Sequence, residues 1–169
     1  GFIEKDCSIS WPVGLVGGFQ GSLSARENVT FVTKIYSNND PYIIEYKVRK
    51  VQEFAEIGKY FDRPFKTYSS GMRSRVTFGL SMAFDFDVYL IDEITSAGDE
   101  RFRKRSRRIL EEKHENSDFI MVDHNLLGLK LHCDRALLLN NGSLMFFDNL
   151  KEGIAMHKKL LEKPALNNL

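Results

Sequence analysis

One short apolar segment that ends in two adjacent acids restricts the possible folds more than any other feature of the chain. The segment runs from Val88 to Ile91 and is followed directly by Asp92 and Glu93. An apolar run without alternation is typical of a strand in a parallel sheet that helices cover on both faces. Ligands of α/β folds bind at the carboxyl ends of such strands. The run therefore predicts a buried parallel strand that carries two carboxylates at the ligand-binding edge.

These two acids have a functional and a structural interpretation. In the first, Asp92 holds Mg²⁺ directly or through water, and Glu93 polarises an attacking water. In the second, both side chains only cap the following turn. His124 follows another apolar run, Phe119 to Val122, which we also expect to be covered on both faces. If the two strands are neighbours, His124 reaches the same edge of the sheet, although a single histidine after a strand is often structural.

A small polar turn begins the most apolar helix of the chain. Ser69, Ser70 and Gly71 precede a run of apolar residues that predicts a buried helix over residues 70–84. The three residues fit an ordinary helix N-cap. The same exposed N–H groups, together with the positive end of the helix dipole, also favour a bound phosphate. The sequence alone leaves both interpretations open.

The remaining patterns alternate between helices and strands. We expect further helices over residues 24–36, 41–57, 99–113, 125–132 and 150–161, and further strands over residues 8–13, 136–139 and 143–147. Asn140-Asn141-Gly142 predicts a hairpin turn between the last two strands. This order predicts a layered α/β fold in which an all-helical insert lies between about residues 22 and 84.

Composition excludes several classes of protein. The 169 residues fit one domain, and 24 basic residues against 23 acidic ones argue against nucleic acid as a partner. The basic cluster from Arg101 to Arg108 has acids around it and is interpreted as a solvated helix face. Cys7 and Cys133 match no metal-binding spacing, and no apolar run is long enough to cross a bilayer.

Five motifs in a fixed order resemble those of the ATPase subunit of ABC transporters. They are Gln20 after a strand, Tyr68-Ser69-Ser70-Gly71-Met72, Leu90-Ile91-Asp92-Glu93, Ser96-Ala97-Gly98-Asp99, and His124. These resemble the Q-loop, signature motif, Walker B strand, D-loop and switch histidine of that family. The resemblance implies a P-loop NTPase-type layered sheet with an inserted helical subdomain. It divides the chain into a partial nucleotide-binding core (1–21), the helical subdomain (22–86) and the rest of the core (87–169).

Other segments resemble the ATP-binding subunits of capsular-polysaccharide exporters in particular. They are Ile9 to Gly14, Gly18 to Leu23, Arg26 to Asn28 and Thr67 to Arg75. The signature departs from the common Leu-Ser-Gly-Gly-Gln, because Tyr68, Ser70 and Met72 replace leucine, glycine and glutamine. Ser69 and Gly71, the positions expected to contact the γ-phosphate, are kept.

The resemblance implies a role for each motif in the hydrolysis of ATP with Mg²⁺. Glu93 and His124 would be catalytic, while Asp92 and Gln20 would contact the metal. Three residues would contact the ATP that a partner subunit holds: Ser69, Ser70 and Gly71. Asp99 would cross the interface of a homodimer. The other implied partners are a transmembrane permease and a polysaccharide cargo, which places the protein peripherally on the cytoplasmic face of the inner membrane.

One motif of the family is missing. No Gly-x-x-x-x-Gly-Lys-[Ser/Thr] occurs in the chain, so the loop and lysine that hold the β- and γ-phosphates are absent. We therefore expect an N-terminally truncated subunit that by itself binds ATP weakly or not at all. Two alternatives remain open: export of O-antigen or teichoic acid, or a non-catalytic interaction module. A DNA-maintenance ATPase is disfavoured, because no coiled-coil heptads interrupt the chain.

Overall fold

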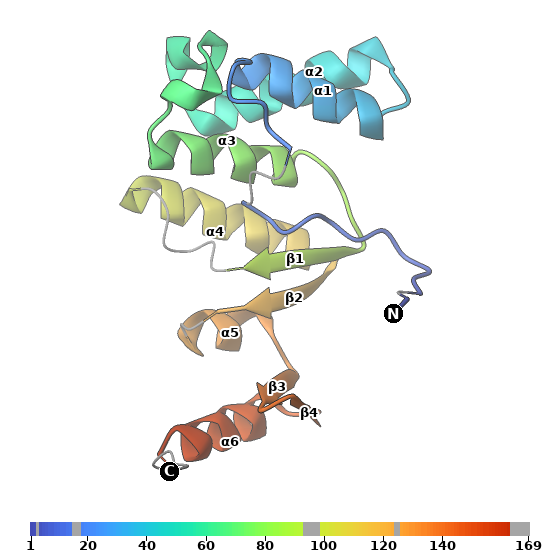
Figure 1. Ribbon diagram of the computed structural model, residues 1–169, viewed down its shortest axis with the longest axis vertical. Coiled ribbons are helices and arrows are strands. Elements are labelled where there is room, and N and C mark those ends of the chain that lie inside the picture. The colour runs from blue at the N-terminus through green and yellow to red at the C-terminus, as the bar shows by residue number, and fades with distance from the viewer. Residues whose placement is uncertain (3, 15–17, 93–98, 124–125, 163–169) are drawn as a thin grey trace. The chain divides into compact units, whose positions relative to one another are not determined.

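The computed structural model describes residues 1–2, 4–14, 18–92, 99–123 and 126–162, which belong to two compact units, residues 1–122 and 123–169 (Figure 1). The first unit contains α1 (Ala25–Tyr36), α2 (Pro41–Ala55), the 3₁₀ helices η1 (Gly58–Asp62) and η2 (Phe65–Thr67), α3 (Ser70–Met82), β1 (Val88–Asp92), α4 (Glu100–His114) and β2 (Asp118–Val122). The second contains α5 (Leu126–His132), β3 (Ala136–Asn140), β4 (Ser143–Phe147) and α6 (Leu150–Glu162). The alternation of helices and strands confirms the predicted α/β class.

Local sequence signals account for the first two helices. Ser24 caps α1 in a capping box with Glu27, as predicted. Asp40 caps α2, and Pro41 occupies the first helical turn. The prediction that α2 continues to residue 57 is wrong. The helix ends at Ala55, because Glu56 adopts a left-handed conformation (φ 49°) while its N–H bonds to the carbonyl of Gln52.

The sheet of the first unit is parallel, as predicted. β1 pairs with β2 in a register that sets Leu90 opposite Ile120 and Asp92 opposite Val122. In Figure 1, α4 lies between α3 and this sheet, while α1, α2 and α3 stack together. Every element between residues 25 and 82 is helical, in agreement with the expected helical insert. The three-part division of the chain stays a prediction.

The expected strand over residues 8–13 is not a regular strand. It forms two isolated parallel bridges to β1, at Ile9 and Val13. Between them the Ser10 hydroxyl, instead of a main-chain carbonyl, accepts the N–H of Leu90 at 2.9 Å. Pro12 has no N–H to donate. The Ser10 hydroxyl, which takes the place of a main-chain acceptor, and Pro12, which has no N–H, therefore interrupt the hydrogen-bond ladder of the predicted strand.

The two strands of this sheet differ in burial. In β1, Tyr89 and Ile91 are buried and contribute to the core. In β2, Ile120 is 54% exposed and Val122 is 62% exposed, so the prediction that both faces are covered is wrong for this strand in the part of the chain that the structure describes. The apolar run predicted a strand. Burial of both faces also requires other elements that pack on them, and the run itself does not specify those elements.

Close packing of α2 on α3 fixes the helical layer. The rings of Phe54 and Phe78 are stacked with centroids 5.4 Å apart, and Phe102 of α4 lies 5.4 Å from Phe54. Gly79 faces this cluster, and a Cβ added there would lie 2.8 Å from Cδ1 of Phe54. Because the ring of Phe54 is itself confined by other rings, it has little room to move away.

We expect Gly79→Val to destabilise the chain by about 1–3 kcal/mol, because the added methyl groups overpack a filled core. Urea unfolding of the 169-residue chain measures the difference. Gly71→Val in the same helix is the matched control, since a Cβ at Gly71 would meet nothing within 4 Å. An equal loss of stability in both variants would show that helix propensity, rather than overpacking, sets the effect.

In the second unit, a β-hairpin is covered by α6. β3 and β4 pair in antiparallel fashion with Asn140 opposite Ser143, and Asn141 and Gly142 both have positive φ, as the predicted turn requires. α6 packs on both strands; a Cβ at Gly153 would lie 2.5 Å from that of Ala136. No helix among the described residues is long and apolar enough to cross a membrane.

Candidate functional site

The carboxyl edge of the parallel sheet carries Asp92. Its side chain is exposed, and the pairing of Asp92 with Val122 makes both strands end at this edge. This is the edge at which α/β folds bind ligands. Glu93 and His124, which follow these strands in the sequence, lie outside the described residues. Their predicted catalytic roles remain predictions.

Gln20 is held by its main chain. The side-chain oxygen of Asn28 accepts the Gln20 N–H at 2.7 Å, and its amide donates to the Gln20 carbonyl at 3.1 Å. Asn28 is buried, whereas Gln20 is exposed. The first turns of α1 therefore fix the backbone of Gln20 and leave its side chain accessible. Sequence reasoning assigned no such role to Asn28, because its partner is eight residues away in a loop.

The amino terminus of α3 is open to solvent. The Ser69 hydroxyl accepts the Met72 N–H at 3.3 Å and so caps the helix, which confirms the structural half of the prediction. Ser69 and Ser70 are exposed, and a Cβ at Gly71 would meet nothing within 4 Å. The first-turn N–H groups of α3 therefore face space that a ligand can enter.

Tyr68 anchors the approach to this helix. Its hydroxyl donates to the Tyr60 carbonyl at 2.5 Å and accepts the Ala25 N–H at 3.4 Å. The side chain is buried, and this burial raises the pKa of the phenol above its ordinary value. A tyrosine in place of the common leucine thus connects η1 and the start of α1 to the segment that leads into α3.

Asp99 is engaged within its own chain. One carboxylate oxygen caps α4 by accepting the Phe102 N–H at 2.8 Å, and the other lies 2.6 Å from Nη2 of Arg75. The hydrogen bond from Phe102 and the charge of Arg75 hold the pKa of Asp99 below its ordinary value. Its predicted place at a dimer interface stays a prediction.

The described site residues do not form one pocket through direct contacts. Within the parts of the chain that the structure describes, no hydrogen bond or ion pair joins Ser69, Ser70 or Gly71 to Asp92 or Gln20. The signature residues and the sheet edge are thus two separate candidate surfaces.

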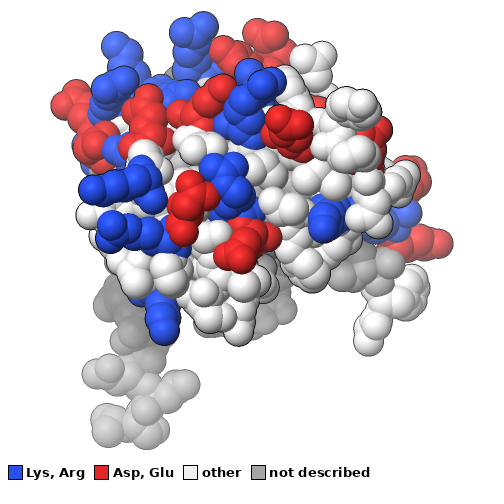
Figure 2. Space-filling view, turned by 90° about the horizontal axis from the view of Figure 1, so that it is seen from above, with Lys and Arg blue, Asp and Glu red and all other residues white. Residues whose placement is uncertain are grey.

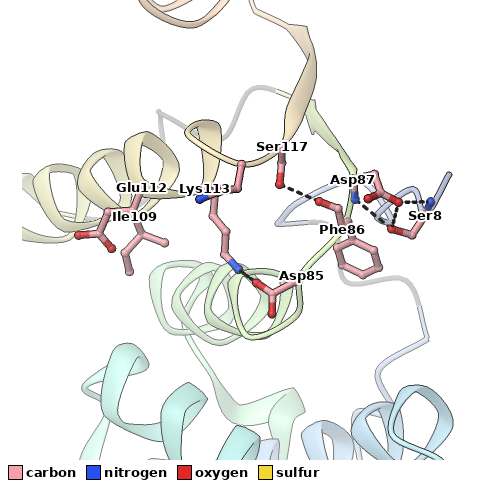
Figure 3. Close-up of a pocket in the computed structure, with 9 residues that line it drawn as sticks. Ser8, Asp85, Phe86, Asp87, Ile109, Glu112, Lys113 and Ser117 are labelled. Atoms are coloured by element: carbon pink, nitrogen blue, oxygen red, sulfur yellow. Dashed lines mark hydrogen bonds and ion pairs between the residues drawn. The ribbon is translucent and has the colours of Figure 1, made fainter.

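A cavity of about 530 Å³ lies at the opposite, amino-terminal ends of β1 and β2 (Figure 3). Its walls include Asp87, whose carboxylate accepts from the Ser8 hydroxyl at 2.6 Å, and Lys113, whose amine lies 2.5 Å from Asp85. The polar groups of the cavity wall that Figure 3 joins with dashed lines are thus paired with one another within the protein. A nucleotide site is expected at the other edge of the sheet, so this cavity is not assigned to it.

Charges of both signs intermingle on the face of the molecule shown in Figure 2. On α4, Arg101 and Arg105 pair with Glu56, and Arg108 pairs with Glu112. These ion pairs agree with the prediction of a solvated helix face rather than a nucleic-acid groove.

Among the described residues no group of three His, Cys, Asp or Glu side chains gathers in a way that could hold a metal by itself. Mg²⁺ in nucleotide sites uses one or two carboxylates together with phosphate oxygens and water. A single exposed carboxylate at a strand end, such as Asp92, therefore fits a metal that arrives with its nucleotide.

Comparisons with known proteins identify relatives of this chain. No family model matches the chain. The polysialic acid transport ATP-binding protein KpsT of Escherichia coli is 54% identical over 160 residues, which are 94% of this chain and 72% of KpsT. The capsule polysaccharide export ATP-binding protein CtrD of Neisseria meningitidis is 38% identical, over 95% of this chain and 72% of CtrD. A teichoic acids export ATP-binding protein of Lactococcus lactis is 31% identical, over 95% of this chain and 34% of its own length.

A solved structure shares the fold. An inward-facing ABC transporter of the metal-chelate type aligns with 88% of this chain and 61% of its own chain, with a TM-score of 0.63 and 17% identity. At this identity the likeness concerns the fold alone. Together with the relatives, which are similar over nearly the whole chain, it shows that this chain belongs to the ABC ATPases, in the family of the ATP-binding proteins of capsule polysaccharide export.

Proposed function

We propose that this chain is part of the ATP-hydrolysing subunit that powers export of capsular polysaccharide across the inner membrane. The observation that carries the proposal is the parallel β1–β2 sheet with Asp92 at its carboxyl edge, in a chain 54% identical to a polysialic acid transport ATP-binding protein. Teichoic-acid relatives are less similar, at 31% identity, which favours a capsular cargo.

In its own subunit the chain would act on ATP from the edge of the sheet. Asp92 would hold Mg²⁺, and the bound ion would offset the negative charge of the phosphates. Glu93, the next residue, would take the proton of the attacking water as a general base. His124 and Gln20 would orient that water and the phosphates. The contacts of Asn28 support the role of Gln20, because they fix the Gln20 main chain and leave its side chain exposed.

The open amino terminus of α3 would serve the ATP of a second copy. The Ser69 hydroxyl caps the helix by accepting the Met72 N–H. The N–H groups of Ser70 and Gly71, which precede Met72 in the first turn, would remain available for a phosphate. The open space at Gly71 would let phosphate oxygens approach the main chain. Two copies arranged head to tail would then form two sites, each with Asp92 from one copy and Ser69–Gly71 from the other.

The permease is proposed to dock on exposed apolar side chains of α1 and α2. Phe31 and Ile35 lie one turn apart on α1, and Tyr42 and Tyr46 lie one turn apart on α2. Their exposed fractions range from 52% at Tyr46 to 83% at Tyr42. Large aromatic and apolar side chains exposed on one helical layer are typical of protein interfaces. Such docking would hold the subunit at the cytoplasmic face of the inner membrane.

We expect the double substitution of Ile35 and Tyr42 by Glu to reduce co-purification with the permease by about 10-fold or more, since it introduces charge into a buried interface. ATP hydrolysis by the detergent-solubilised subunit should persist. The matched control is Leu161→Glu on α6, which also replaces a largely exposed apolar side chain. Equal recovery of the permease with the double variant and with wild type would contradict this docking surface.

Cells that lack their own capsule-export ATPase test the export proposal. We expect the natural protein that carries this chain to restore polysaccharide at the cell surface, and Asp92→Asn to fail because it weakens the metal site. Antibody binding to surface polysaccharide, normalised to the amount of protein produced, measures the result. If wild type restores no export, or if Asp92→Asn restores it fully, the proposal is wrong.

A further inference from the structure

Three helices of the first unit meet at the carboxyl terminus of α2, where two arginines bind main-chain carbonyls. Nη1 of Arg75, from α3, donates to the Ala55 carbonyl at 3.3 Å. Nη1 of Arg105, from α4, donates to the Phe54 carbonyl at 3.4 Å. The last carbonyls of a helix have no partner within the helix and carry partial negative charge, so cations bind well there. The two arginines thus make equivalent contacts with α2.

Their ion pairs lead to different places. Arg105 pairs at 2.8 Å with Glu56, the C-cap residue of α2. Arg75 pairs at 2.6 Å with Asp99, the N-cap residue of α4. Because the other Asp99 oxygen holds the Phe102 N–H, the first turn of α4 is tied through one carboxylate to the guanidinium of α3. Arg105 strengthens a helix end, whereas Arg75 joins two helices that begin at candidate site residues.

Several contacts hold the Arg75 guanidinium in place. Its side chain is only 18% exposed, against 61% for that of Asp99. The guanidinium carbon lies 5.1 Å from the centroid of the Phe102 ring, so the cation also contacts the first turn of α4 through an aromatic face. An arginine can bind a carbonyl and a carboxylate at once with its planar fork, which a lysine cannot reproduce.

We infer that Arg75 is a positioning residue for ATP hydrolysis, because it holds the start of α4, at Asp99, in register with α3, whose amino terminus carries Ser69 and Gly71. The inference rests on the proposed function, which places Asp99 and the signature residues at the interface between two copies. Through Arg75 these two elements keep a fixed mutual position, so that contacts from both with the partner subunit form together. In this role Arg75 would act through Asp99 and α4, and would not itself touch nucleotide or metal.

Kinetics of the native transporter complex test the inference. We expect Arg75→Met to lower kcat for ATP about 10-fold or more, with KM changed less than about threefold, because misplaced groups slow the reaction more than they weaken substrate binding. Arg75→Lys keeps a charge opposite Asp99 and should recover part of the lost kcat. Arg105→Met is the matched control: it removes an arginine from the same helix end without touching Asp99, and its kcat should stay near that of wild type.

Hydrogen exchange in the nucleotide-free natural protein that carries this chain supplies a readout that does not depend on turnover. Arg75→Met should speed exchange of the Phe102 amide about 10-fold relative to Arg105→Met, because only the former loosens the capping carboxylate. When each Met variant also carries Asp99→Asn, the two should show equal exchange of the Phe102 amide, since a neutral cap no longer responds to the guanidinium. Equal kcat losses in the Met variants at positions 75 and 105, or equal Phe102 exchange in both, would overturn the inference.

The result also separates this inference from the proposed function. If Glu93→Gln stops hydrolysis but Arg75→Met leaves kcat unchanged, the ATPase proposal stands and the positioning role of Arg75 is wrong. If Glu93→Gln hydrolyses ATP normally, the proposed mechanism itself fails.

Discussion

Glu93→Gln is expected to lower the steady-state rate of ATP hydrolysis by about 100-fold or more, because general-base catalysis contributes a factor of this order. Glutamine has nearly the shape of glutamate but cannot accept a proton from water. The amide also removes one negative charge near the phosphates, so ATP binding should persist. The variant should therefore still form ATP-dependent dimers, which size-exclusion chromatography with Mg-ATP measures.

The neighbouring acid supplies the comparison for this variant. Asp92→Asn removes the proposed metal ligand and should weaken both Mg-ATP binding and ATP-dependent dimerisation. Glu93→Gln should keep both. Normal hydrolysis by Glu93→Gln would remove Glu93 from the role of base. Loss of dimerisation in that variant would instead assign it a binding role.

Gly71→Asp is expected to reduce hydrolysis by a comparable factor for a different reason. A carboxylate in the first turn of a helix interacts favourably with the dipole, and a Cβ at Gly71 has open space, so the chain should keep or gain stability. The same negative charge would repel the phosphates of the partner's ATP. Gly71→Asn, the neutral isostere, should lose less activity. Urea unfolding of both variants checks that the fold is intact.

Mixing the two defective subunits tests whether each site is shared between copies. In a mixed dimer of Glu93→Gln and Gly71→Asp subunits, one site contains both substitutions and the other contains neither. Half of randomly assembled dimers are mixed, so co-expression should restore about one quarter of wild-type turnover at most in a head-to-tail arrangement. If both residues served one site within a single chain, no dimer would contain an intact site.

Total inactivity of the mixture, with mixed dimers shown by two different affinity tags, would contradict the shared-site arrangement with independent sites. Each parental variant alone provides the background rate. A mixture of Gly71→Asp with a second Gly71→Asp preparation under another tag is the matched control. Its dimers contain no intact site in either arrangement.

Local signals in the sequence predicted most of the secondary structure. The capping box at Ser24, the Asp40-Pro41 start of α2 and the Asn141-Gly142 turn each satisfy main-chain groups within a few residues. Such interactions are encoded by neighbouring residues, so they can be read without the fold. Asp92 at the end of β1 followed the same logic, since an apolar run that stops at an acid marks a strand end.

The wrong predictions depended on residues distant in the sequence. The segment 8–13 failed to form a regular strand because the Ser10 hydroxyl replaces a main-chain acceptor opposite Leu90. Helix α2 ends earlier in the sequence than predicted, because Glu56 adopts a left-handed conformation. In this position the carboxylate of Glu56 pairs with Arg101 and Arg105 of α4. Neither contact leaves a periodic signal in the chain.

The order and chemistry of the motifs alone determined the family, the ABC ATPase fold class and the identity of the candidate residues. These properties reside in short segments, because caps, strand ends and glycine turns depend on adjacent residues. Only the tertiary structure decided how the candidate residues are held: Gln20 by Asn28, and Asp99 by Arg75. The physical reason is that a charged or polar side chain finds its partner by proximity in space. The fold brings Arg75 and Asp99, which are 24 positions apart, within 2.6 Å of each other.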